Sequence, residues 1–311
     1  MSNKTYYIDG RPVKDINCSL CSGNNIEVLF SKHQFDWVRC KNCGMVWVNP
    51  QLLPESISEI YEKIYPTKSA ICGGNIVRGI SKEHCKLLLG LKKMNLGKRG
   101  KILDIGCFEG HFLNSARLLG WEVYGTEISK PAVQVANKYF NLDVRLGSIL
   151  DLDFPDNCMD VVTLIDVLEH LPDPKNCLAK INKMLKSKGI LYIWTPNFNS
   201  FTRKFLLGAD WGGVIFPWHL QYFSHRTISL LLRKTGFKII KLTSRNLLYK
   251  KGDPYLILRN GVEVTGRRKP AFFDKILHAS INKGFNILSV ILSKLQIYVG
   301  GQIEIFGRKK T

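Results

Sequence analysis

A strand followed by a glycine loop and a helix is the feature that most constrains this fold. Residues 101–112 read KILDIGCFEGHF, where an apolar strand runs into Gly106 and a second glycine, Gly110, lies four residues later. Residues 111–119 have a helical pattern, so the strand–loop–helix context of a nucleotide-type loop is met. Phe108 stands where such a loop usually carries another glycine. Such a loop alone is a weak indication, and its meaning depends on the later parts of the chain.

Short apolar strands alternate with helical patterns from residue 101 to about residue 245. Ser129 followed by Pro131 predicts a helix start, and a helix over 175–188 is expected to end at Gly189. The alternation predicts an α/β fold with a doubly wound, mostly parallel sheet. The predicted strands are 101–105, 122–126, 144–146, 161–165 and 190–194, and a strand pattern at 302–306 closes the chain.

A carboxylate stands at the end of the second predicted strand, about twenty residues beyond the loop. Glu127 lies at the strand end where a ribose diol is bound in nucleotide-binding folds. A hydrogen bond to a charged acceptor contributes about 1.5–3 kcal/mol. Taken alone, Glu127 would be a solvated loop acid. Together with the glycine loop it favours a ribose-containing cofactor.

Four of the nine cysteines are spaced as metal ligands. Two C-x2-C pairs, Cys18 with Cys21 and Cys40 with Cys43, are separated by eighteen residues. Such pairs complete the tetrahedral thiolate set that Zn²⁺ prefers, and four protein ligands leave no open position. The pattern predicts a structural zinc. A coincidence of buried cysteines and an iron centre are the alternatives.

Length and charge suggest the organisation and the partners. The 311 residues, 45% of them apolar, suffice for a large domain with an appendage. We expect a zinc-ribbon module at 1–50, a helical connector at 51–100 and an α/β domain at 101–311. The net charge of +20 favours an anionic partner such as nucleic acid, lipid headgroups or a phosphorylated substrate, although a merely basic enzyme is also consistent.

The sequence suggests a cytoplasmic protein with a contact to the inner face of the membrane as one option. It shows no signal-peptide pattern, and no apolar stretch is long enough to span a bilayer. Residues 270–296 form an amphipathic helical pattern that carries Lys275, Lys283 and Lys294. This helix could lie on an anionic membrane surface, or pack on the catalytic domain or on a second subunit.

Several segments resemble class I S-adenosylmethionine-dependent methyltransferases. These are LDIGCFEG, YGTEIS and FPDNCMDVVTLIDVLEHLPDP, and the EH pair is similar to that of sugar and ubiquinone-pathway members. VRCKNCGMVWVNP resembles the zinc module of polysaccharide-associated members. The resemblance covers about residues 100–245 and implies a Rossmann-like sheet of seven strands, with 302–306 as its terminal antiparallel strand. It also implies S-adenosylmethionine as the cofactor.

The resemblance carries roles onto individual residues of this chain. It implies that Asp104 orders the loop near the methionine amino group, and that Gly106 and Gly110 let the backbone approach the cofactor. Ser148 and Ile149 would lie against the adenine, although many relatives have Asp where Ser148 stands. The Phe108 ring is expected to turn from the cofactor or to form a wall beside its methionine end. The full implied cofactor-binding set is Asp104, Gly106, Cys107, Gly110, Glu127, Ile128, Ser148, Ile149 and Asp166.

The predicted catalytic residues are Asp166, His170 and His219. Histidine suits proton removal near neutral pH, so His170 is the first candidate base; bracing of the turn after the strand is the alternative. Asp166, Glu169 and His170 are expected to converge where the strand turns into a helix, and related quinone-pathway enzymes hold a divalent metal with a similar acidic-plus-EH cluster, so the resemblance implies Mg²⁺ as a further cofactor. His219 belongs to a second group, with Trp211, Trp218, Tyr222 and His225, that is expected to cover the acceptor pocket; ordinary packing is the alternative.

The leading hypothesis is a methyltransferase that acts on a sugar, a nucleotide-sugar or a lipid-linked glycan. One alternative is an RNA methyltransferase that uses the ribbon and the basic surface to bind nucleic acid. A non-catalytic zinc-ribbon interaction protein with a degenerate methyltransferase domain is a third hypothesis.

Overall fold

The computed structural model describes eight segments of the chain. They are residues 5–8, 10–53, 56–57, 80–95, 97–201, 203–215, 218–245 and 301–310. The amphipathic helix predicted at 270–296 and half of the connector predicted at 51–100 lie outside these segments.

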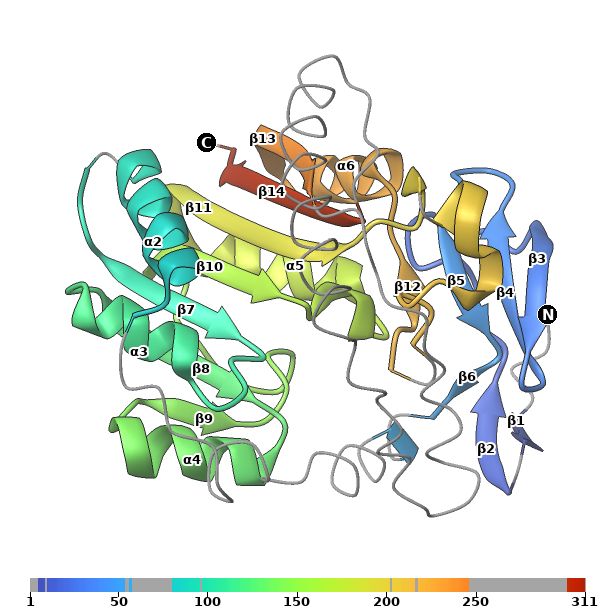
Figure 1. Ribbon diagram of the computed structural model, residues 1–311, viewed down its shortest axis with the longest axis horizontal. Helices are drawn as coiled ribbons and strands as arrows, with labels where there is room; N and C mark the ends of the chain where they lie inside the picture. The colour runs from blue at the N-terminus through green and yellow to red at the C-terminus, as the bar shows by residue number, and fades with distance from the viewer. Residues whose placement is uncertain are drawn as a thin grey trace, which may run out of the picture.

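A seven-stranded sheet forms the centre of the molecule (Figure 1). Its spatial order is β13-β14-β11-β10-β7-β8-β9, which confirms the predicted α/β fold. The five strands from β11 to β9 are parallel, and β14 runs antiparallel between β11 and β13, as expected for the closing strand. The strands are β7 (Lys101–Ile105), β8 (Glu122–Glu127), β9 (Val144–Leu146), β10 (Met159–Ile165), β11 (Leu185–Pro196), β13 (Phe237–Arg245) and β14 (Gln302–Lys309).

Helices cover both faces of the sheet, because its strands are apolar on both sides. Neighbouring residues alternate between faces: Ile102 packs with α2 and α3, whereas Leu103 packs with α5 and α6. The fourth helix, α4, packs along β8 and β9. The helices are α2 (Lys82–Met94), α3 (His111–Leu118), α4 (Lys130–Phe140), α5 (Pro174–Met184) and α6 (His225–Lys234). In the described part of the chain, none is long and apolar enough to cross a bilayer.

Local capping fixes where helices begin, and one predicted helix end is wrong. Ser129 caps α4 by accepting the Ala132 N–H, as predicted, and Ser224 caps α6 in a capping box with Thr227. Helix α5 ends at Met184, four residues before the predicted end, because the next residue, Leu185, is extended and begins β11 opposite Met159. The Leu185 side chain is fully buried, so tertiary packing overrides the helical pattern of residues 185–188.

The N-terminal region forms two small antiparallel sheets. One contains β3 (Ile26–Lys32), β4 (Phe35–Cys40), β5 (Val46–Asn49) and the two-residue strand β12 (Gln221–Tyr222), which the sequence did not reveal. The other joins β1 (Thr5–Ile8), β2 (Arg11–Lys14) and β6 (Gln51–Leu52). Because β12 comes from the second half of the chain, segments on both sides of the predicted boundary at residue 50 share one sheet.

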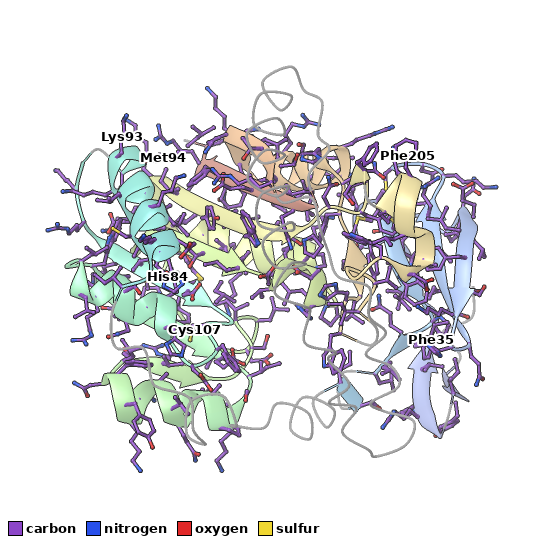
Figure 2. The ribbon with its side chains drawn as sticks, viewed as in Figure 1. Phe35, His84, Lys93, Met94, Cys107 and Phe205 are labelled. Carbon is purple, nitrogen blue, oxygen red and sulfur yellow. The ribbon has the colours of Figure 1, made fainter. Side chains whose placement is uncertain are left out.

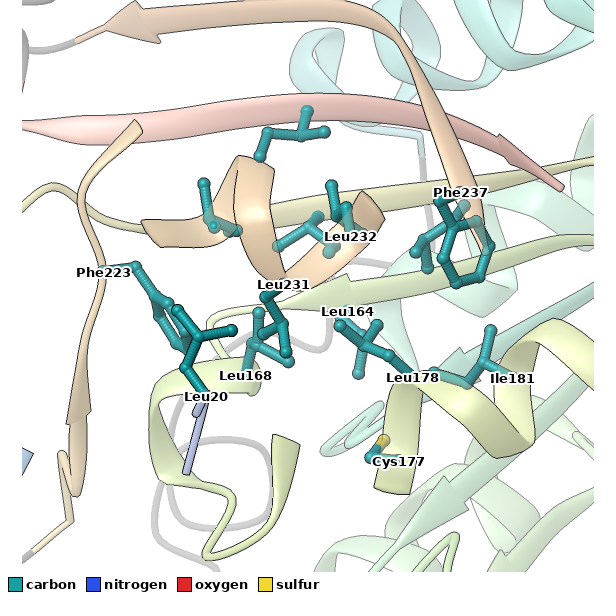
Figure 3. Packing of buried hydrophobic residues seen from close by; sticks show 14 of the residues in the cluster. Leu20, Leu164, Leu168, Cys177, Leu178, Ile181, Phe223, Leu231, Leu232 and Phe237 are labelled. Carbon is teal, nitrogen blue, oxygen red and sulfur yellow. The ribbon is translucent and has the colours of Figure 1, made fainter. Parts of the chain in front are cut away.

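The same two regions also share a hydrophobic core. Leu20, from the cysteine-containing segment, belongs to one buried cluster with Leu168, Phe223 and Leu231 (Figure 3). All four side chains are at most 2% exposed. The Lys234 ammonium group at the end of α6 also donates to the Leu20 carbonyl oxygen at 3.4 Å. The ribbon therefore packs on the α/β domain as part of its core.

Replacement of Phe223, 1% exposed, tests this shared core. Phe223→Ala is expected to lower the free energy of unfolding by about 3–5 kcal/mol, because it leaves a cavity between the ribbon and α6. Phe205, 70% exposed (Figure 2), is the control, and Phe205→Ala is expected to change stability by at most about 0.5 kcal/mol. Urea unfolding measures both. Equal midpoints for the two variants would contradict the shared core.

Candidate active site

A cavity of about 500 Å³ opens at the carboxyl ends of the parallel strands. From β7 the chain proceeds to β8 and β9 on one side, then crosses to β10 and β11 on the other. The cavity lies at this reversal, where open α/β sheets bind their ligands, and its size suits a small molecule. It is lined by Ile57, Ile105, Gly106, Phe108, Thr126, Glu127, Ile128, Gly147, Ser148, Ile149, Leu150, Asp151, Asp166, Val167, His170, Leu171, Pro172 and Asp173.

Gly106 lets the backbone of the loop approach the cavity closely. Its φ is +67°, and an added Cβ would lie 2.6 Å from Cγ2 of Val167. The amides of Gly106 and Cys107 both donate to the carbonyl oxygen of Thr126, which fixes the loop against β8. Cys107, a predicted cofactor contact (Figure 2), is buried in an apolar cluster and is not among the lining residues.

Phe108 takes the conformation of the glycine that it replaces. Its φ is +50°, in the left-handed region, and its N–H donates to Oε2 of Glu127 at 2.9 Å. The side chain is 36% exposed and contributes to the cavity wall. The loop therefore keeps its course without the third glycine, at the cost of left-handed backbone strain.

Glu127 is buried at the cavity with part of its acceptor capacity already used. Oε1 accepts the Ser129 N–H at 2.9 Å, and Oε2 accepts the Phe108 N–H. The Ile128 N–H is a third backbone donor to this carboxylate. Of about four lone-pair positions, one is then left, and a second ligand donor would share an oxygen. Burial raises the pKa of Glu127, while the backbone donors oppose that shift. A diol is a ligand that would supply two such donors.

Asp104 lies behind the lining residues. Its Oδ1 accepts a hydrogen bond from the Thr163 hydroxyl at 2.5 Å. Burial, with a smaller effect from the charge of Glu127, raises the pKa of Asp104 to about 7. Gly110 also lies outside the cavity lining, at the N-cap of α3, with φ +80°.

The remaining predicted cofactor contacts form one side of the cavity. Ile128, Ser148 and Ile149 all line it, together with Leu150. The Ser148 hydroxyl accepts the Leu150 N–H at 3.2 Å, which stabilises the turn. These side chains provide an apolar wall that suits a flat aromatic ring.

Asp166 and His170 line the opposite side of the cavity. Asp166 follows β10 directly and has a φ of +53°. Partial desolvation by the surrounding protein raises its pKa to about 6, while part of the residue remains exposed to solvent. The Nδ1–H of His170 donates to the Trp218 carbonyl oxygen at 2.9 Å. Burial lowers the pKa of His170 to about 4. The imidazole is therefore neutral, with its lone pair on Nε2.

Glu169 and His219 are buried beneath His170. Oε2 of Glu169 accepts the Thr195 hydroxyl at 2.8 Å, and Nδ1–H of His219 donates to the Gly213 carbonyl oxygen at 2.8 Å. The two imidazole rings lie edge to face, with centroids 4.7 Å apart. Burial and the charge of Asp166 raise the pKa of Glu169 to about 8, and burial holds that of His219 well below its usual value. The tertiary structure thus brings together His170 and His219, two predicted residues that are about fifty positions apart in the sequence.

The aromatic group expected to cover the acceptor pocket is packed elsewhere. Trp211, Trp218 and Tyr222 belong to a buried cluster with Trp37 of the ribbon, and His225 is buried at the start of α6. None of these residues, nor His219, is among the described residues that line the cavity. Their arrangement agrees with the packing alternative.

The four ribbon cysteines converge as their spacing predicts. Sγ of Cys18 lies 3.4 Å from that of Cys43, Sγ of Cys21 lies 3.5 Å from that of Cys40, and all four lie within 4.8 Å of one another. Burial raises the pKa of Cys18, and that of Cys43 to about 11. A bound cation is what would hold such sulfurs as thiolates.

Comparison with known proteins identifies the family. A family model described as "Methyltransferase domain" matches residues 80–242, slightly more than half of the chain. The chain belongs to this methyltransferase family. All but one of the cavity-lining residues, Ile57, fall within the matched methyltransferase region.

Individual relatives agree with this methyltransferase assignment. The chain is 27% identical over 139 residues to a probable S-adenosylmethionine-dependent methyltransferase of Mycolicibacterium smegmatis, with 44% of this chain and 52% of that protein covered. It is 32% identical over 174 residues to a ubiquinone biosynthesis O-methyltransferase of Alkalilimnicola ehrlichii, with 49% and 68% covered. The chain spans about half the length of the curated relatives that it matches first.

A solved structure supports the fold alone. The [4+2]-cyclase SpnF is 17% identical to this chain and superposes with a TM-score of 0.51, covering 82% of this chain and 95% of SpnF. Because SpnF is named as a cyclase, the shared fold does not decide the reaction.

Sequence reasoning missed parts of the candidate site that depend on tertiary contacts. Val167 excludes any side chain at position 106, Thr195 fixes Glu169, and Ile57 reaches the cavity from the segment before α2. Asp151 and Asp173 also line the cavity. Of these residues, only Val167 could have been found from the sequence, because it directly follows the predicted site residue Asp166.

Replacements of Phe108 test the strain in the loop. Phe108→Val should be less stable than Phe108→Gly by about 1–2 kcal/mol, because a β-branched residue is disfavoured at positive φ. Urea unfolding of both variants beside the natural protein provides the measurement. A valine variant as stable as the glycine variant would contradict the left-handed conformation.

Proposed function

We propose that this protein is an S-adenosylmethionine-dependent methyltransferase. The observation that carries the proposal is the joining of the Gly106 loop and the Glu127 carboxylate in one cavity at the reversal of strand order. The family match and the S-adenosylmethionine-dependent relatives support it.

The residues present fit the cofactor. The Glu127 carboxylate lines the cavity where it can accept hydrogen bonds from the ribose, and Ile128, Ile149 and Leu150 provide an apolar side for the adenine. Gly106 leaves room for backbone contact with the methionine end, where Asp104 lies behind the loop. S-adenosylmethionine, when bound, supplies a methyl group on a positively charged sulfur.

The chain itself supplies orientation and proton acceptance on the acceptor side. His170 is neutral, and the Trp218 carbonyl oxygen fixes its ring and tautomer. Asp166 lies on the same side of the cavity. We assign His170 the role of general base for an acceptor hydroxyl and Asp166 the role of positioning the acceptor. His219 lies behind His170 and supports that ring.

The proposed acceptor is a sugar, a nucleotide-sugar or a lipid-linked glycan. The resemblance of the ribbon to the zinc module of polysaccharide-associated members supports this choice. The ubiquinone O-methyltransferase relatives support a hydroxyl group as the reacting atom. Contact with an anionic membrane remains a prediction for the lipid-linked acceptor, since the basic helix concerned lies outside the described segments.

A specific surface supports the RNA alternative. A cleft of about 410 Å³ at the amino ends of the strands, opposite the candidate active site, has six basic residues in its lining: Lys98, Arg99, Lys101, Lys186, Lys188 and Arg308. Two acidic residues also line it, and each pairs with a lysine: Glu122 with Lys101 and Asp160 with Lys186. Such a cluster attracts phosphate groups. Strong, salt-dependent binding of RNA would favour this alternative, whereas co-sedimentation with anionic liposomes would favour the lipid-linked acceptor.

We also propose that Cys18, Cys21, Cys40 and Cys43 hold a structural zinc. The two cysteine turns match, since the Ser22 N–H donates to Cys18 O and the Gly44 N–H donates to Cys40 O. Each turn presents two sulfurs to one point. The ion would stabilise the ribbon at the place where it packs on α6.

Replacement of Glu127 tests cofactor binding. Glu127→Gln is expected to weaken S-adenosylmethionine binding about tenfold to a hundredfold, because hydrogen bonds to a charged acceptor contribute about 1.5–3 kcal/mol. Titration calorimetry measures the affinity. Glu122→Gln, on the exposed start of the same strand, is the matched control and should bind as the natural protein does.

Two outcomes would contradict the cofactor assignment. The first is no S-adenosylmethionine binding by the natural protein, which would favour the non-catalytic hypothesis. The second is binding that appears only in Phe108→Gly, which would show that the ring blocks the site. We expect Phe108→Gly to bind the cofactor with nearly the natural affinity.

Transfer of a labelled methyl group tests the acceptor class. The protein is incubated with methyl-labelled S-adenosylmethionine and, separately, a nucleotide-sugar pool, a lipid extract and RNA. We expect label in one of the first two fractions, and its loss in His170→Ala. Label in RNA alone would overturn the glycan proposal while leaving methyl transfer intact.

A further inference from the structure

We propose that Glu169, His170 and His219 bind one divalent transition-metal ion beneath the active-site cavity. One ligand atom from each residue lies within 4.8 Å of the other two, and this set is separate from the four cysteines. Oε1 of Glu169 lies 4.0 Å from Nε2 of His219. Metal binding can be tested without methyl transfer, but it uses the same Nε2 lone pair of His170, so the general-base role assigned above applies to the metal-free protein.

This ligand set does not fit the Mg²⁺ that the quinone-pathway resemblance implies. That resemblance places the ion at Asp166, Glu169 and His170. Among the described residues, the Asp166 carboxylate is outside the group of mutually close ligand atoms, and His219 takes its place. Mg²⁺ requires octahedral oxygen ligands, whereas two imidazoles and one carboxylate suit Zn²⁺, Fe²⁺ or Co²⁺. The arrangement therefore favours a transition metal over Mg²⁺.

Both imidazoles are oriented as metal ligands usually are. Nδ1–H of His170 donates to Trp218 O at 2.9 Å, and Nδ1–H of His219 donates to Gly213 O at 2.8 Å. Each backbone carbonyl fixes the tautomer that leaves the lone pair on Nε2. A hydrogen bond from the other ring nitrogen is the common outer-sphere partner of a metal-bound histidine.

The Glu169 carboxylate has an oxygen that a cation would satisfy. The side chain is 1% exposed, and Thr195 donates to Oε2. Oε1 is buried and has no hydrogen-bond partner among the described residues. A buried polar atom without a partner is costly, and this atom faces His219. A metal ion would give it a partner.

The backbone holds the three ligands together from two distant segments. Glu169 and His170 belong to the short helix η1 (Leu168–His170), and His219 precedes β12. The Leu220 N–H donates to the Glu169 carbonyl oxygen at 2.9 Å, which joins the segments directly. Metal–ligand bonds of about 2.0–2.2 Å place tetrahedral ligands about 3.4 Å apart, so the observed 4.0 Å between Glu169 and His219, and separations of up to 4.8 Å within the set, would have to close on metal binding. Because His170 lines the cavity, an open coordination position would face it.

Metal stoichiometry of the full-length protein tests the proposal. The protein is saturated with Zn²⁺ or Co²⁺, separated from free ion, and analysed by mass spectrometry of its metal content. We expect two equivalents for each chain, of which the ribbon supplies one. His219→Gln and Glu169→Gln should each lower the content to one, and His84→Gln, in α2 (Figure 2), should keep two.

The Co²⁺ form identifies the site even where a variant folds poorly. In the natural protein, two shifted, exchangeable imidazole N–H resonances are expected beside the thiolate-to-cobalt absorption of the ribbon. Cys40→Ser should remove the absorption and keep the resonances. A single equivalent in the natural protein without these resonances would overturn the proposal. Two equivalents retained in folded His219→Gln would overturn it as well. If the natural protein bound a second equivalent of Mg²⁺ but not of Zn²⁺ or Co²⁺, the site would be an oxygen site and the proposal would be wrong.

Discussion

The pairing of β5 with β12 is the constraint on which the arrangement of this molecule depends. Gln221 lies opposite Trp47 and Tyr222 opposite Val46, so two residues of the α/β domain complete the sheet of the ribbon. The adjacent Leu220 N–H donates to the Glu169 carbonyl oxygen. One short segment therefore joins the ribbon to the turn after β10. Because His219 precedes that segment, the same pairing places its ring beside His170.

The electrostatics of the cavity contrast with those of the chain as a whole. The net charge is +20, yet Asp151 and Asp173 line the cavity together with four further carboxyl groups around it, those of Asp104, Glu127, Asp166 and Glu169. Protein surroundings raise the pKa of all four. Such groups are stabilised as carboxylates when a positively charged ligand binds near them. A cofactor with a sulfonium and an ammonium group provides that charge, which agrees with the proposed function.

Much of the fold, and the placement of Gly106 and Glu127 at one cavity, was predictable, because local patterns determine it. Apolar runs identify the parallel strands, Ser129 identifies a helix start, and the spacing of the cysteines predicts their convergence. The end of α5 was not predictable, because burial of Leu185 against the core outweighs helical periodicity. Strand β12 was not predictable either, since a two-residue strand is too short to show an alternation of apolar and polar residues.

The sequence by itself determined the α/β class, the glycine loop, the carboxylate at the end of β8 and the cysteine quartet. These features depend on residues near one another in the chain, where spacing fixes geometry. Only the tertiary structure decided that Phe108 adopts a glycine conformation, that the aromatic group packs against the ribbon, and that His219 meets Glu169 and His170. Those outcomes depend on contacts between segments about fifty or more residues apart, or on the fit of one side chain in a crowded loop, and sequence spacing does not encode either.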